Sequence, residues 1–218
     1  MKIILIGTVT FSKEMLDVLL ENNADILGVV TSADSGINSD YFDLKPLCIK
    51  NKIPFLVTDD VNSKKTYEWV NSFNPDVIFC FGWSRLIKKE LLLSSPIGVI
   101  GYHPAELPKN RGRHPIIWSL VLGLDKTAST FFIMDINADS GDIISQVPVL
   151  IDDSDNAETL YKKLVAIAKI QIIDLMSKIN DLDPHRILQD KSGNNNWRKR
   201  DENDGEIDWR MSADSINN

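Results

Sequence analysis

The apolar residues of this chain form short runs of strand length that alternate with segments of helical spacing. Five runs precede residue 103, at residues 2–7, 25–31, 53–57, 75–82 and 97–102. Between them, apolar residues recur three or four positions apart, which is typical of helices that pack on one side. Strands that alternate with helices predict an α/β fold, in which a mostly parallel sheet carries helices on both faces. Ligands on such sheets bind beyond the carboxyl ends of the strands, so we expect the functional residues there.

The second half of the chain continues this pattern and then loses it. We expect a helix near 113–122, strands near 127–135 and 143–151, and a long helix over 156–180. The buried face of the long helix is predicted by residues at helical spacing, which are Leu160, Leu164, Ile167, Ile170 or Gln171, and Leu175.

Residues 181–218 are polar, so the chain is expected to have a main domain over 1–180 and a short C-terminal extension over 181–218. Within the extension, "SGNNN" (192–196) has the composition of a mobile loop. The last residues, "MSADSINN", read like the start of a helix that is cut off before it develops. The expectation is that the extension is shortened or ends early.

Composition narrows the class of protein. The 218 residues carry a formal net charge of −7, so the chain has no general positive field to hold a nucleic acid. The N-terminal apolar run is too short for a signal peptide or a membrane span. Cys48 and Cys80 lie in apolar surroundings without the spacing of a metal site, and we interpret them as core residues. We therefore expect a cytoplasmic protein with no nucleic acid, membrane or metal partner.

The first candidate for chemistry is His103, which follows a predicted strand directly. Histidine is a residue type that can exchange a proton during a reaction near neutral pH. The loop after it carries Lys109, Arg111 and Arg113 between prolines, which stiffen the backbone as the positioning of an anionic ligand requires. The alternatives are a histidine that is hydrogen-bonded in a turn and a group of cations that is simply solvated.

The second candidate is "DINADSGDII" (135–144), which holds Asp135, Asp139 and Asp142 between two predicted strands. Such a sequence also suits an ordinary hairpin turn. A functional role needs one of these carboxylates to reach His103, where it would orient the imidazole and stabilise its protonated form. The chain lacks G-x-G-x-x-G, G-K-[ST], H-E-x-x-H and G-x-S-x-G, which disfavours dinucleotide, P-loop, zincin and α/β-hydrolase chemistry.

Together these motifs resemble a known family. "GYHPAELPKNRG" (101–112), followed at the right distance by "ADSGD" (138–142), is similar to the N10-formyltetrahydrofolate-dependent formyltransferases, whose pattern is N-x-H-x-S-L-L-P-x-x-R-G and then L-D-T-G-D. "IGTVTFS" (6–12) resembles the start of that family, and "DGEIDW" (204–209) resembles its D-G-x-I-D-W segment. The most similar members are the sugar N-formyltransferases, which are related to the N-terminal domain of methionyl-tRNA formyltransferase.

The resemblance implies a Rossmann-like α/β domain and a set of site residues. His103 and Asp139 would be the catalytic pair, in which His103 takes a proton as the acceptor amine attacks the formyl carbon. The donor, N10-formyltetrahydrofolate, would lie along two short segments. The cofactor-binding residues implied are Trp83, Arg85, Leu86, Ile87, Ala138 and Asp142.

Gly101 departs from the family pattern. The family has an asparagine two residues before the histidine, where it helps to stabilise the oxyanion that forms during transfer. Loss of one such donor costs about 2.7–4 kcal/mol. We expect another donor or a water molecule to replace it; slow turnover and loss of catalysis are the alternatives.

The expected acceptor is a nucleotide-linked amino sugar, as in the biosynthesis of lipopolysaccharide or other surface glycans. Enzymes that formylate such sugars share the D-G-x-I-D-W region, whereas the glycinamide ribonucleotide enzymes lack it, and the tRNA enzymes carry a further barrel domain for which this chain has no room. The substrate-binding residues we expect are Lys109, Arg111 and Arg113 for the diphosphate, with Tyr41 and Trp209 as further contacts.

Three other functions stay open at this stage. The acceptor could be another small amine, such as an amino acid or a carrier-bound group. The same residues could hydrolyse formyltetrahydrofolate, or the chain could bind folate without catalysis, as Gly101 would allow. The sequence also leaves open whether the protein forms a homodimer.

Overall fold

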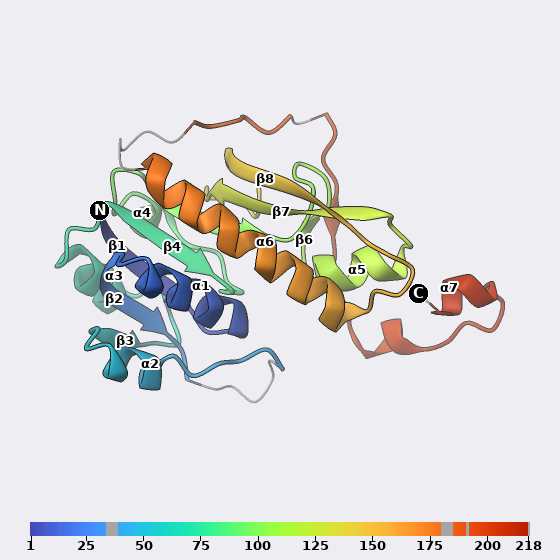
Figure 1. The fold of residues 1–218 in the computed structure, drawn as a ribbon, viewed down its shortest axis with the longest axis horizontal. Helices are drawn as coiled ribbons and strands as arrows, with labels where there is room; N and C mark the ends of the chain where they lie inside the picture. Colours follow the sequence, from blue (N-terminus) through green and yellow to red (C-terminus); the bar gives the residue numbers. More distant parts are fainter. Residues whose placement is uncertain (34–38, 180–184, 191, 218) are drawn as a thin grey trace.

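A seven-stranded sheet forms the centre of the protein in the computed structural model, which describes residues 1–33, 39–179, 185–190 and 192–217 (Figure 1). Its strands stand in the order β3-β2-β1-β4-β5-β7-β8. They are β1 (Lys2–Gly7), β2 (Asp25–Thr31), β3 (Phe55–Val57), β4 (Val77–Phe81), β5 (Val99–His103), β7 (Lys126–Ile133) and β8 (Ile143–Leu150). The neighbours from β3 to β5 pair in parallel, whereas β7 is antiparallel to β5 and β8. This mostly parallel sheet confirms the predicted α/β fold class.

The sheet separates two apolar cores, because successive side chains of a strand point to opposite faces. In β1, Ile3 and Leu5 belong to one core, and Ile4 and Ile6 belong to the other. The first core also contains side chains of α1 (Thr10–Glu21), α2 (Lys45–Lys50) and α6 (Ala157–Lys178), and the second contains those of α3 (Lys64–Asn71) and α4 (Lys89–Leu92). Both faces are thus covered, as buried parallel strands require.

Helix α6 crosses the front of the sheet beside α1 (Figure 1). It begins after Asn156, whose side chain accepts hydrogen bonds from two backbone N–H groups of the first turn. The sequence left two candidates for one position of its buried face, and the structure selects Gln171, because Ile170 is 71% exposed. The buried Gln171 amide donates to the carbonyl of Ser129 and the hydroxyl of Ser145, so it ties α6 to β7 and β8.

The strands expected near 127–135 and 143–151 are β7 and β8, which pair as an antiparallel hairpin, and the helix expected near 113–122 is α5 (Pro115–Val121). The two cysteines are buried in the core, and burial raises the pKa of Cys48 to about 11 and that of Cys80 to about 12. Both observations agree with the interpretation of these thiols as packing residues.

The C-terminal part lies along one side of the sheet and then leaves it. A short strand, β9 (Asn196–Trp197), pairs in parallel with β6 (Arg111–Gly112) in the loop after His103. The chain continues through η2 (Glu202–Gly205) to α7 (Ala213–Asn217), which lies beyond α5 and buries no residue (Figure 1). The predicted domain boundary at 180/181 lies outside the described residues. Of the expected loop at 192–196, residues 192–195 belong to no helix or strand, and Asn196 begins β9.

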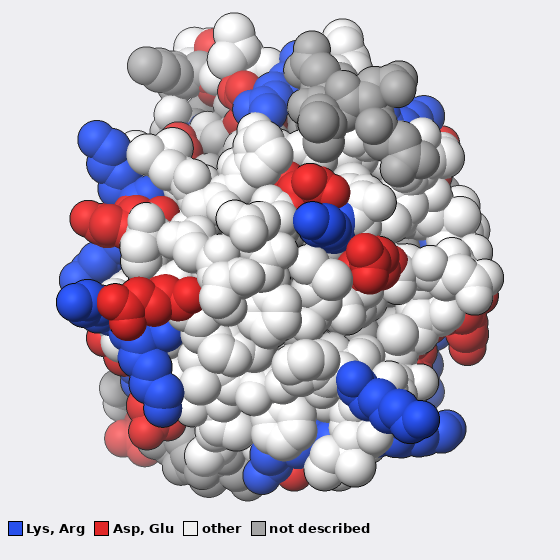
Figure 2. Space-filling model, turned by 90° about the vertical axis from the view of Figure 1, so that its left-hand side faces the viewer, with Lys and Arg blue, Asp and Glu red and all other residues white. Residues whose placement is uncertain are grey.

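The end of the molecule at which the parallel strands begin has a largely uncharged centre, with Lys, Arg, Asp and Glu side chains around it (Figure 2). Neither sign of charge dominates this face in that view. The loop after β5, which begins after His103, follows the carboxyl end of that strand, whereas the turn after β7 starts beside the first residues of β5, because β7 is antiparallel to it.

Candidate functional site

His103 is the last residue of β5, and its side chain is almost completely buried. Its Nε2 lies 2.8 Å from the backbone oxygen of Asn110. A carbonyl oxygen can only accept, so Nε2 carries the proton of this hydrogen bond and Nδ1 is the nitrogen that remains for exchange. The fold therefore fixes the tautomer of this imidazole through the loop that follows it.

The turn between β7 and β8 brings a carboxylate to that nitrogen. Asp139 Oδ2 lies 3.6 Å from His103 Nδ1 and accepts a hydrogen bond of 2.9 Å from the backbone N–H of Gly112. Asp139 has a left-handed backbone (φ 53°), which aspartate tolerates better than most residues. The turn is held from within by Asp135, whose side chain accepts from Asn137 N and Ser140 Oγ. Of the three aspartates in the motif, one shapes the turn and another faces the histidine.

Two glycines allow the backbone segments around this pair to approach each other closely. A Cβ at Gly141 would lie 1.7 Å from the backbone oxygen of Ile133, and a Cβ at Gly112 would lie 2.2 Å from that of Trp197. Real Cβ atoms do not come this close to backbone, so these positions need glycine. The G of "DSGD" and the G of "NRG" are thus explained by packing.

A third segment, which the sequence did not point to, supports the turn. Gln189 donates from Nε2 to the backbone oxygens of Asp139 (2.9 Å) and Gly141 (2.7 Å). Its Oε1 accepts from the Arg111 guanidinium at 3.1 Å and 2.5 Å. Asn195 adds a contact, since its side chain accepts from Asn110 N. Both residues stand in the polar extension, where no periodicity or motif singles them out.

This arrangement gives Arg111 a position different from the expected one. Its side chain is buried and bonded to Gln189, and it is not among the residues that line the cavity described next. Its main contribution in this structure is to hold Gln189, and through it the Asp139 turn.

A cavity of about 520 Å³ opens beside His103. Its walls come from the loop before α2, the loop after β5, the first turn of α5 and the first turns of α6. The described residues that line it are Ser39, Asp40, His103, Pro104, His114, Pro115, Ile116, Ile117, Ala157, Glu158 and Tyr161. A smaller cavity of about 150 Å³ shares Asp40, Pro104, Ile116 and Tyr161 with it. A small organic molecule would fit within reach of the imidazole.

Gly101 lies on the same face of β5 as His103, and the space beside it is filled. A Cβ there would lie 2.9 Å from Met134 Cγ and 3.0 Å and 3.1 Å from two ring carbons of Phe132. These nearest atoms are apolar, so the side chains that take the place of the family's asparagine are not hydrogen-bond donors. The predicted replacement donor is not found among these nearest atoms.

Four of the residues expected to bind the formyl donor follow β4, and their surroundings differ from one residue to the next. Trp83 is partly buried against the second core, and its Nε1 is buried with no hydrogen-bond partner among the described residues. Arg85 donates to the backbone oxygen of Asp59, while Leu86 is 56% exposed. Ile87 is buried in the second core.

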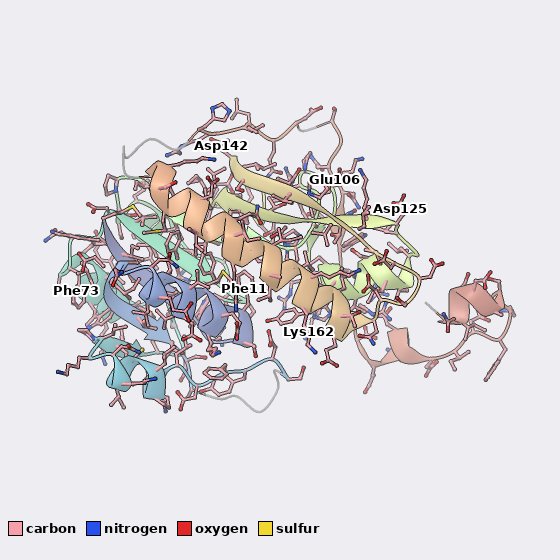
Figure 3. The ribbon with its side chains drawn as sticks, in the orientation of Figure 1. Phe11, Phe73, Glu106, Asp125, Asp142 and Lys162 are labelled. Carbon is pink, nitrogen blue, oxygen red and sulfur yellow. The ribbon has the colours of Figure 1, made fainter. Side chains whose placement is uncertain are left out.

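The two expected donor-binding residues of the turn lie at the edge of the sheet. Ala138 is exposed next to Asp139. Asp142 lies where β8 begins (Figure 3), and its backbone oxygen accepts from Ile133 N at 2.8 Å. Arg113 connects the loop after β5 to the donor segment after β4, since its Nη1 lies 3.4 Å from the backbone oxygen of Ser84.

The remaining expected substrate contacts are not brought together. Lys109 and Arg113 are exposed on the loop after β5. Tyr41 pairs with Val9 in an isolated bridge, and its hydroxyl lies 3.4 Å from the backbone oxygen of Ser32. Trp209 is 81% exposed. None of these four residues lines the larger cavity in the part of the chain that the structure describes.

His114 is a cavity residue that the sequence did not single out. It has a left-handed backbone (φ 55°) directly before α5, and its Nδ1 lies 3.4 Å from Arg200 N. Burial lowers the pKa of this imidazole, and the positive charges of Arg113, Lys199 and Arg200 lower it further.

Two features are absent from the residues that the structure describes. These residues contain no group of three or more His, Cys, Asp or Glu side chains that could hold a metal ion. Within the same ranges, no helix combines the length and the apolar character needed to cross a bilayer.

A family model and a known protein both match this chain to formyltransferases. The family model described as "Formyl transferase" matches residues 1–176. The methionyl-tRNA formyltransferase of Clostridioides difficile (strain 630) is 31% identical over 222 residues, which cover 100% of this chain and 72% of that protein.

Solved structures show the same fold at lower identity. An N-formyltransferase from Helicobacter canadensis, in complex with folinic acid and dTDP-3-aminofucose, aligns with a TM-score of 0.78 and 18% identity, over 100% of this chain and 78% of that one. Phosphoribosylglycinamide formyltransferase from Bacillus halodurans aligns with a TM-score of 0.70 and 21% identity, over 84% of this chain and 98% of that one. The similar proteins thus include three classes of acceptor.

Proposed function

The chain belongs to the formyl transferase family, and from that premise we propose that it moves a formyl group from N10-formyltetrahydrofolate to the amine of a nucleotide-linked amino sugar. The observation that carries the proposal is the pair formed by His103 and Asp139 beside a 520 Å³ cavity. Because the chain belongs to this family, it is a formyltransferase. The identity of the acceptor and the roles of the residues are our proposal.

His103 acts as the proton acceptor for the attacking amine. Nδ1 is the nitrogen in question, because Nε2 already donates to Asn110 O. An amine that attacks a carbonyl carbon gains positive charge and must lose a proton, and a positioned imidazole typically contributes a factor of about 10²–10⁴ to such a step. The lining of the cavity by His103 gives the amine access to this side chain.

Asp139 stabilises the charge that His103 acquires. At 4 Å and an effective dielectric constant of 20, two unit charges attract by about 4 kcal/mol, and the two groups lie 3.6 Å apart. The Gly112 N–H bond and the support from Gln189 hold the carboxylate in this position. The C-terminal extension thereby supports the site through Gln189, which donates to the backbone of the turn that carries Asp139.

The donor segments suit a folate. Leu86 and Ile136 expose apolar side chains (56% and 65%), and the buried Trp83 Nε1 is a donor without an acceptor among the described residues. An apolar, ring-shaped ligand with hydrogen-bonding edges matches such a surface. The residues that would hold it are Trp83 to Ile87 and Ala138 to Asp142. The folate, when bound, supplies the transferable formyl group, and the protein supplies orientation and the proton acceptor.

Two observations support a sugar acceptor over the other classes. The Helicobacter canadensis structure aligns with all of this chain, including the extension, whereas the glycinamide ribonucleotide enzyme aligns with 84% of it. The net charge of −7 disfavours a tRNA, whose phosphates need a positive field.

The test is a formyl-transfer assay with matched histidine variants. The full chain is incubated with N10-formyltetrahydrofolate and a panel of nucleotide-linked 3-amino and 4-amino sugars, and formylated products are detected by mass spectrometry. His103→Ala should reduce kcat by at least about 10²-fold. His185→Ala, at an exposed histidine, should retain full activity.

The outcomes separate the alternatives. Formylation of an amino acid with no reaction of any sugar would move the acceptor to another class. Formate released without any amine would identify a hydrolase. An unchanged rate in His103→Ala would refute the catalytic assignment.

A further inference from the structure

The carbonyl group that fixes the tautomer of His103 belongs to a backbone segment held by the C-terminal extension. His103 Nε2 lies 2.8 Å from Asn110 O. The same peptide unit, which joins Asn110 to Arg111, donates its N–H to Asn195 O at 3.1 Å. A donated N–H polarises a peptide unit and strengthens its carbonyl as an acceptor. One peptide unit therefore contacts the imidazole through its oxygen and the extension through its nitrogen.

The preceding peptide unit is held by the side chain of the same extension residue. Asn110 N donates to Asn195 Oδ1 at 2.6 Å, and Asn195 Nδ2 donates to Asn110 Oδ1 at 3.2 Å. The Asn195 amide thus uses both its oxygen and its nitrogen on one residue. With its backbone oxygen and its side chain, Asn195 contacts the peptide units on both sides of the Asn110 α-carbon.

Asn110 needs such support because its backbone is left-handed (φ 61°). This region is uncommon for residues other than glycine, although asparagine tolerates it better than most. A rotation of the backbone at Asn110 into a more common region would turn its carbonyl oxygen away from His103. The contacts with Asn195 oppose this rotation, because it would separate the two flanking N–H groups from their acceptors.

We propose that Asn195 is a positioning residue for formyl transfer: it fixes the Asn110 carbonyl, which keeps the proton of His103 on Nε2 and leaves Nδ1 available to accept another. This inference rests on the proposed function, in which Nδ1 takes the proton of the attacking amine. Without a fixed acceptor at Nε2, the Asp139 carboxylate beside Nδ1 favours the other tautomer, in which Nδ1 carries the proton. That tautomer cannot accept a proton at Nδ1.

The extension supplies this contact from 85 residues further along the chain. Gln189 of the same extension supports the turn that carries Asp139, so the extension holds both partners of the pair. The side chain of Asn195 is exposed, and it lines neither cavity among the described residues. Its replacement should therefore alter the histidine while the core and the cavity walls stay as they are.

The first experiment reads the tautomer directly and needs no substrate. The full chain, which has three histidines, is labelled with ¹⁵N-histidine, and the ring nitrogens are recorded by long-range ¹H–¹⁵N correlation at pH 8. His103→Ala assigns the His103 signals. The wild type should show Nε2 protonated and Nδ1 unprotonated. Asn195→Ala should shift both signals toward a mixture of the two tautomers.

Two further variants serve as controls. Asn195→Asp keeps an acceptor for Asn110 N and should retain the wild-type pattern of signals. Asn196→Ala removes the adjacent asparagine side chain, which is also exposed, and should leave the His103 signals unchanged. Urea unfolding of all variants reports whether the fold is intact.

The second experiment measures turnover with an acceptor that the wild type formylates. Asn195→Ala should lower kcat about threefold to tenfold, as expected for the loss of one hydrogen bond that supports the proton acceptor, with KM for donor and acceptor unchanged. Asn195→Asp should keep most of the wild-type kcat, and Asn196→Ala should keep all of it. A change confined to KM would contradict a positioning role.

The two measurements separate this inference from the proposed function. An unchanged tautomer in Asn195→Ala would overturn the inference whatever happens to kcat, and so would a wild type with the proton on Nδ1. A shifted tautomer with unchanged kcat would overturn the positioning role, whereas a shifted tautomer with lower kcat would support it. If no sugar of the panel is formylated, the proposed acceptor is wrong and the tautomer alone decides the inference.

Discussion

Restoring the family's asparagine at position 101 should destabilise this protein, because its place is already occupied. The Cβ alone would lie 2.9 Å from Met134 Cγ and 3.0 Å from the Phe132 ring, well inside the usual carbon–carbon contact of about 3.5–4.0 Å. Phe132 is 2% exposed in its own apolar cluster, whereas Met134 is unbranched and partly exposed, so Met134 is the residue that must move.

The magnitude follows from two costs. Overpacking of a filled site typically costs about 1–3 kcal/mol. A carboxamide buried without partners among Met134 and Phe132 costs a further 1–3 kcal/mol or so. The lower entropy of the unfolded chain on replacing glycine offsets only about 0.4–1 kcal/mol. We therefore expect Gly101→Asn to reduce the free energy of unfolding by roughly 2–5 kcal/mol.

The assay is urea unfolding followed by circular dichroism. Gly101→Ala isolates the Cβ contact and should cost less than Gly101→Asn. In Gly101→Asn/Met134→Ala the space is available, so the asparagine should cost less than it does in the wild-type background, as a double-mutant cycle reports. If the carboxamide then reaches the reacting group, kcat should rise above that of Met134→Ala by up to about 10²-fold. A Gly101→Asn protein as stable as the wild type, with the same denaturant slope, would refute the reasoning.

The other predictions concern the pair, its support and the thiols. Asp139→Asn keeps an acceptor for Gly112 N but loses the charge beside His103, and should lower kcat by about 10²–10³-fold with little change in stability; an unchanged kcat would contradict the pairing. Gln189→Leu removes the acceptor of the buried Arg111 guanidinium and two bonds to the turn; it should cost about 2–3 kcal/mol in urea unfolding, and a neutral result would show that Gln189 is dispensable. Burial raises the pKa of Cys48 to about 11 and that of Cys80 to about 12, so both thiolates are scarce at pH 8. Neither thiol should react with Ellman's reagent in the native protein, and both should react in urea; rapid labelling without denaturant would contradict their burial.

The local pattern of the sequence determined most of the strands and helices between residues 1 and 179. Apolar runs and helical spacing identify the strands and α6, because burial on a sheet or on one helix face imposes a period that is visible along the chain. The motif around His103 and the "ADSGD" turn could be found in the same way, since glycines and turn residues report local backbone requirements. The choice between Ile170 and Gln171 could not be made, because a glutamine becomes buried only where the sheet offers partners.

Only the tertiary structure decided which residues meet at the site. A polar segment without periodicity supplies Gln189, Asn195 and Arg200. Gln189 contacts the turn that carries Asp139, and the other two contact the loop after β5, from which they are more than 80 residues distant in the sequence. It also showed that Met134 and Phe132 fill the space beside Gly101. Such contacts depend on shape and on hydrogen-bond partners that are distant along the chain, so no local pattern contains them.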